Sequence, residues 1–186
     1  MALNVKINFE DLYETITMDA DLRSSVFDAV LKGGTTTRLG IQISSKIHPL
    51  MPNVYNLAFG PIDINNEIDD QAKLTHQNHS KVFSTIIFAG LSFLTEHKEN
   101  YLGIDGSNNA RAYLYYRCIQ NNFEYLRSFF KIYGVNHYVR ILRRAIDDSY
   151  SFDPEDLVAI PKLIEFRESI QHEKLYNHFI FKIKEE

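Results

Sequence analysis

The spacing of apolar residues changes along the chain, and this change constrains the fold more than any other feature of the sequence. Several segments alternate apolar and polar residues, as a strand buried on one face does. Others repeat apolar residues every three or four positions, as a helix packed on one face does. Because the two kinds of segment do not alternate strictly, the pattern predicts an α+β fold, with a mainly antiparallel sheet and two long helices packed on one face.

Alternation, or a short apolar run, marks the expected strands. They cover residues 5–9, 39–43, 54–59, 100–105, 135–142 and 175–184. Gly33 and Gly34 predict a turn before the second of these segments, and Gly60 with Pro61 ends the third.

Helical spacing marks two long segments. The first covers residues 80–97, with Asn78 or Ser80 as the N-cap. The second runs to Tyr133 with Gly134 at its C-terminus, and we expect it to be the longest helix. A third helix is expected to begin at Asp153 and Pro154, with an interruption at Pro161.

Composition places the chain among compact globular proteins. Its 186 residues fit a single domain, residues 1–186, and contain no internal repeat. A net charge of -4 does not favour nucleic-acid binding, although Arg140, Arg143 and Arg144 beside Tyr138 leave a local basic patch open. The single cysteine, Cys118, lies in an apolar helical run, where we expect a buried and unreactive thiol. With no leader or membrane segment in the opening residues, we expect a cytoplasmic protein without membrane contact.

The stretch IDGSNNARAYLYYR, residues 104–117, places polar turn formers where a strand meets a helix. The free N–H groups of such a helix end attract anions, and Arg111 in the first turn can bind a phosphate or carboxylate. The candidate ligand-binding residues are Gly106, Ser107, Asn108, Arg111 and Tyr115. A structural alternative stays open, in which Ser107 or Asn108 caps the helix, Gly106 forms a turn and Arg111 pairs with an acid such as Asp105.

This stretch also carries a resemblance. Together with YNLAFGPID, EIDD and NHSKVFSTIIFAGLSFL, it resembles an uncharacterised family of small bacterial proteins, a domain of unknown function. Matches to the pattern G-S-x-x-x-R-x-x-L-Y are Gly106, Ser107, Arg111, Leu114 and Tyr115. The chain departs from the family at Pro61, where the pattern has an acid.

A weaker similarity links Asn109, Ala112, Leu114 and Tyr115 to the Gcn5-related acetyltransferases. That resemblance implies acyl transfer from acyl-CoA. The chain lacks the Gly-rich pyrophosphate loop and the later Gly-Phe of that class, and its spacing is one residue short.

Two further clusters contain residues that can carry chemistry. His76 and His79 follow Glu67, Asp69 and Asp70, but two histidines in a polar loop fall short of a metal site, so we expect solvated loop residues and no metal.

Arg167 and His172 have the spacing of some metal-independent ribonucleases, without the helical bundle that such a site needs.

Two functions stay open at this point. The first is a binding or interaction protein that needs no cofactor, with a protein partner or an anionic small molecule, as in a toxin–antitoxin or phage-defence pair. The second is an enzyme acting on a phosphate-bearing or acyl-CoA substrate, with Arg111 holding the anion and Tyr115 or His79 donating a proton. A homo-oligomer is compatible with either.

Overall fold

A computed structural model describes residues 4–65, 67–70, 72, 74–106, 108–143, 150–170 and 175–185, with the backbone alone for residues 138–143 and 150–156. No helix within these ranges is long and apolar enough to cross a membrane.

The framework of the fold is an eight-stranded sheet with the strand order β1-β2-β3-β4-β5-β8-β6-β7. Its strands are β1 (Thr15–Met18), β2 (Ser24–Val30), β3 (Thr36–Ile47), β4 (Val54–Pro61), β5 (Tyr101–Asp105), β6 (Phe130–Arg143), β7 (Tyr150–Leu163) and β8 (His178–Ile183). Neighbouring strands are antiparallel except β4 and β5, which are parallel.

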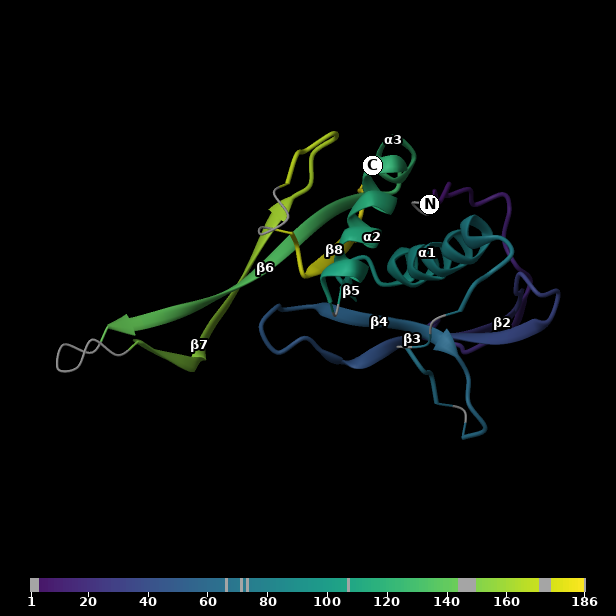
Figure 1. Cartoon of the computed structure of the whole chain (residues 1–186), viewed down its shortest axis with the longest axis horizontal. Helices are drawn as coiled ribbons and strands as arrows, with labels where there is room; N and C mark the ends of the chain where they lie inside the picture. Colours follow the sequence, from purple (N-terminus) through teal and green to yellow (C-terminus); the bar gives the residue numbers. More distant parts are fainter. Residues whose placement is uncertain are drawn as a thin grey trace.

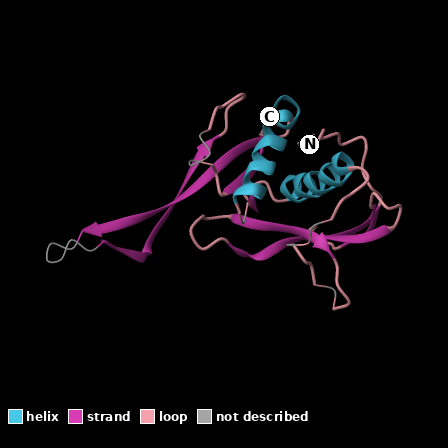
Figure 2. Cartoon of the chain, in the orientation of Figure 1, coloured by secondary structure: helices cyan, strands magenta, loops and turns pink. Residues whose placement is uncertain are grey.

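Two long helices, α1 (His79–Glu96) and α2 (Asn109–Asn121), lie over one face of this sheet (Figures 1 and 2). The short helix α3 (Phe123–Leu126) follows α2. The prediction of an α+β fold, with a mainly antiparallel sheet and two long helices on one face, is confirmed.

The core lies between the helices and the sheet. On β8, Phe179 and Phe181 point into this core, whereas Ile180 belongs to a smaller apolar cluster with Val54 and Val135 on the opposite face. Alternation along one strand thus supplies two separate apolar layers.

Most of the expected elements are present. The segments at 39–43, 54–59 and 135–142 lie in β3, β4 and β6, those at 100–105 and 175–184 overlap β5 and β8, and Gly33 and Gly34 lie in the turn before β3. Helix α1 matches its prediction, and Asn78 is its N-cap, with its side chain accepting a hydrogen bond from the Lys81 N–H at 2.9 Å. The strands β1 and β2 were not predicted from the sequence.

The prediction of a strand at residues 5–9 was wrong. Val5 and Ile7 are buried, as the alternation suggested, but the segment pairs with helix side chains and not with a strand. The Ile7 N–H donates to Asn122 Oδ1 at 2.7 Å, and the Asn8 N–H donates to Ser84 Oγ at 2.9 Å. These side chains satisfy the backbone as a neighbouring strand would.

Two helix predictions also fail. Helix α2 ends at Asn121, and Gly134 lies inside β6, so α1 is the longer helix. The helix expected after Asp153 and Pro154 is the strand β7, whose position at the edge of the sheet tolerates proline.

Candidate functional site

A cleft of about 300 Å³ opens between the first two turns of α1, the first two turns of α2 and the end of β4. The term cleft denotes the space lined by Leu39, Phe59, Gly60, Pro61, Asp70, Ala72, Leu74, His76, His79, Val82, Phe83, Arg111, Leu114 and Tyr115. Its volume is at the lower end of the range for small-molecule sites.

Both helices present their N-terminal ends at the cleft. His79 and Val82 come from the first turn of α1, and Arg111 comes from the first turn of α2. Neither first turn contains an acidic residue. The partial positive charge of the two helix ends is therefore not offset within the helices themselves.

The turn before α2 has a structural role as well. Asn108 caps the helix, because its Oδ1 accepts a hydrogen bond from the Arg111 N–H at 3.0 Å. Gly106 is needed because a Cβ at that position would lie 2.8 Å from Ala112 Cα. The structural alternative thus holds for these two residues, whereas Arg111 and Tyr115 line the cleft. Ser107 lies outside the described residues.

A side pocket of about 60 Å³ adjoins the cleft at the end of β5, and the two share Phe59, Asp70, Arg111 and Tyr115. Asn56 and Asp105 are found only in the side pocket. Asn56 Oδ1 is buried without a hydrogen-bond partner among the described residues.

Charges act on one another across this site. Burial raises the pKa of Asp105, and the positive charge of Arg111 opposes that rise. Burial also raises the pKa of Tyr115, again against the effect of Arg111. Tyr115 therefore keeps its hydroxyl proton at neutral pH and is suited to donate a hydrogen bond.

His76 is not the solvated loop residue that we expected. The side chain is 9% exposed, lines the cleft and has a buried Nδ1 without a hydrogen-bond partner in the described ranges. Its backbone forms a β-bridge with Leu31, which holds this loop against the end of β2.

His79 is close to His76, with 5.6 Å between the ring centroids. Burial lowers the pKa of both rings, so both are neutral at pH 7.

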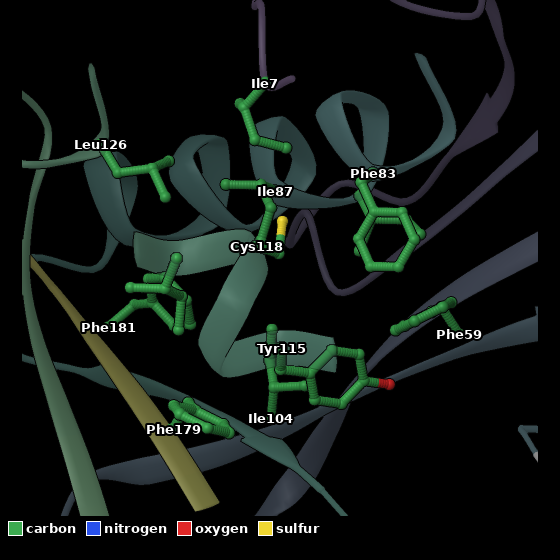
Figure 3. A pocket seen from close by; sticks show the side chains of 12 residues that line it. Ile7, Phe59, Phe83, Ile87, Ile104, Tyr115, Cys118, Leu126, Phe179 and Phe181 are labelled. Atoms are coloured by element: carbon green, nitrogen blue, oxygen red, sulfur yellow. The ribbon is translucent and has the colours of Figure 1, made fainter. Parts of the chain in front are cut away.

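Behind the cleft lies a small inner cavity of about 30 Å³ (Figure 3). Its lining consists of Ile7, Phe59, Phe83, Ile86, Ile87, Ile104, Tyr115, Cys118, Ile119, Leu126, Phe179 and Phe181. The prediction of a buried Cys118 is confirmed, and burial raises the pKa of its thiol to about 12. The sulfur is therefore an apolar part of the wall and not a nucleophile.

The structure adds no support for the other candidate clusters, which are the metal site, the ribonuclease-like pair and the basic patch. Within the part of the chain that the structure describes, no group of three or more His, Cys, Asp or Glu side chains could hold a metal ion. His172 and Arg144 lie outside the described residues, as do the side chains of Tyr138, Arg140 and Arg143.

Comparison with known proteins gives a family but no activity. A family model matches residues 13–150, and its description is "Family of unknown function (DUF6934)". The chain belongs to DUF6934. No curated protein and no solved structure matches it. The resemblance to acetyltransferases has no counterpart in these comparisons.

The matched region of this DUF6934 member contains the whole cleft, since the cleft residues run from Leu39 to Tyr115. Three residues of the motif noted in the sequence, Arg111, Leu114 and Tyr115, line it together. Sequence reasoning missed the contributions of Phe59, Phe83 and Asn56, because their spacing indicates only strand and helix positions.

Proposed function

We propose that this DUF6934 protein binds a small molecule that carries a phosphate or carboxylate group, in the cleft between α1 and α2. The observation that carries the proposal is the meeting of two helix N-termini, Arg111 and the buried His76 at one cavity, where His76 Nδ1 has no hydrogen-bond partner among the described residues.

An anion fits this arrangement for electrostatic reasons. Helix N-termini offer N–H groups that have no partner within the helix, and each cap described here satisfies one of them. A guanidinium adds a full positive charge and a planar set of donors. The Tyr115 hydroxyl and a neutral His76 can donate further hydrogen bonds to the same anion.

Hydrogen-bond acceptors near Arg111 restrict the kind of ligand. Asp70 lines both the cleft and the side pocket. Asn56 lines the side pocket, where its Oδ1 can accept a hydrogen bond. These oxygens would accept hydrogen bonds from hydroxyl or amino groups. The proposed ligand therefore combines one anionic group with hydrogen-bond donors, as a hydroxylated phosphate ester does.

Replacing Arg111 tests the proposal. Linkage predicts that phosphate at about 100 times its Kd stabilises the wild-type chain by about 2.7 kcal/mol, which raises Tm by roughly 5 to 10 °C. Arg111→Ala should remove this rise. The measurement is thermal unfolding in phosphate and in chloride of equal ionic strength.

Arg117→Ala is the matched control, because Arg117 lies on the same helix, above the Tyr113 ring at 5.7 Å, and does not line the cleft. This variant should respond to phosphate as the wild type does. If phosphate raises Tm equally in Arg111→Ala, or in none of the three proteins, the anion site is contradicted.

One observation favours a protein partner, as in a toxin–antitoxin or phage-defence pair, as a second candidate function. The β6–β7 hairpin extends away from the helices (Figure 1). Val158 and Ile160 on β7 are each 53% exposed. Exposed apolar side chains grouped on a projecting element are typical of an interaction surface.

A further inference from the structure

We infer that the ligand of the cleft carries a compact apolar group beside its anionic group, and that this apolar group occupies the inner cavity. The inference rests on the proposed function, because it extends the same site inward from Arg111. It adds a short hydrocarbon group to the proposed ligand, which already combines a phosphate, phosphonate or related anionic group with hydrogen-bond donors, and simple alkylphosphonates serve as probes of that hydrocarbon group.

Three aromatic side chains separate the cleft from the inner cavity. Phe59, Phe83 and Tyr115 line both spaces, and all three are only partly buried. Their ring centroids lie 6.1 Å apart for Phe59 and Phe83, and 6.5 Å from each of these to Tyr115. The proposal requires that a change in the rotamer of one of these rings joins the two spaces.

Polarity changes across this partition. The cleft has Arg111, Asp70 and His76 in its wall, whereas the inner cavity is lined by aliphatic and aromatic side chains and the Cys118 sulfur. Figure 3 shows the Tyr115 hydroxyl directed away from Cys118. An apolar cavity of this kind holds water poorly and accepts hydrocarbon.

The size of the inner cavity limits the apolar group. Its volume of about 30 Å³ suits one or two carbon atoms and not a long acyl chain. The proposal places the anion at Arg111 against the outer side of Tyr115, so that a hydrocarbon attached directly to the anionic group, or through one atom, enters the inner cavity. This gives a ligand with a charged head and a very short tail.

A series of anions tests the inference by calorimetry. We compare inorganic phosphate with methylphosphonate, ethylphosphonate and propylphosphonate. Their hydrocarbon group is attached through a C–P bond, so they contain no phosphate ester that could be hydrolysed during the measurement. Burial of each methylene group should strengthen binding by about fourfold until the cavity is filled. In wild-type protein, Kd should therefore fall from methylphosphonate to ethylphosphonate and then stop falling.

Cys118→Val fills the inner cavity and Cys118→Ala enlarges it, and Cys118 does not line the cleft that holds Arg111. The valine variant should lose the gain from the ethyl group while binding inorganic phosphate as the wild type does. The alanine variant should extend the gain to propylphosphonate. If Cys118→Val does not fold, Ile87→Phe fills the same cavity from α1.

The two proposals fail in different ways. Equal affinity for phosphate and all phosphonates, or a gain that Cys118→Val leaves unchanged, overturns the apolar subsite alone. Absence of binding for every anion overturns the anion site and the subsite with it.

Discussion

His178 shows how a single residue couples stability to pH in this fold. Its side chain lies on the sheet face opposite the helices, is 4% exposed, and has a buried Nε2 with no hydrogen-bond partner in the described part of the chain. The His48 ring lies 5.4 Å from the His178 ring, and the His137 ring lies 6.2 Å from the His48 ring. Burial, with His48 and His137 nearby, lowers the pKa of His178 to about 4.

This shift predicts a loss of stability in mild acid. Above pH 6.5, His178 is neutral in both the folded and unfolded chain, so it has no effect. Between pH 6.5 and 4 only the unfolded chain binds the proton, and the free energy of unfolding falls by about 3 kcal/mol in total. Urea unfolding across this pH range should show the fall, and His178→Gln should reduce it. An equally steep fall in the variant would assign the pH dependence to other groups.

At the level of single residues, chemistry that acts locally could be read from the sequence. The cap at Asn108 and the inert Cys118 depend on their own helix, and both were anticipated, the cap as one of two candidates. The burial of His76 and His178 depends on strands far away in the chain, such as the bridge from His76 to Leu31. No local pattern contains that information.

Among the elements, the segment before β1 depends on Asn122, which joins it to the end of α2. Asn122 accepts from the Ile7 N–H at 2.7 Å and donates to the Val5 carbonyl at 2.9 Å. The side chain is 6% exposed, so water cannot easily replace these bonds. The Asn122 amide therefore takes the place of the missing strand partner.

Asn122→Ala should lower the free energy of unfolding by about 2 to 3 kcal/mol, because it leaves a buried donor and a buried acceptor unsatisfied. The Ile7 amide should also lose its protection from hydrogen exchange. Asn121→Ala is the control, because Asn121 is the neighbour of Asn122 in the sequence and its side chain is exposed. Equal unfolding midpoints for the two variants in urea would contradict this role.

The predicted boundaries of helices and strands were wrong where apolar residues fit both the helical and the strand period. Leu126, Phe129 and Phe130 continue the helical spacing of α2, although the first lies in α3 and the last begins β6. All of them contact the core, so their apolar character does not distinguish a helix from a strand. The segment of β7 contains two prolines, and only its place at the edge of the sheet explains why it is a strand.

For the whole molecule, the parallel pairing of β4 with β5 is the feature that creates the site. The connection between them contains α1, and β5 leads directly into α2, so both helices begin near the ends of these two strands. The connection also brings Asp70 and His76 to the cleft. The sequence predicted a helix start near residue 109 with Arg111 in its first turn. It could not predict that the start of α1 lies beside the start of α2.

The measurement that tests the central claim most directly is an NMR titration of the wild-type protein with inorganic phosphate. If one anion sits between the helix ends, the backbone amides of His79, Ser80, Asn109 and Ala110 should shift together with one common Kd, and Arg111→Ala should remove these shifts. Shifts confined to other regions, or no saturable shifts at either helix start, would contradict the account.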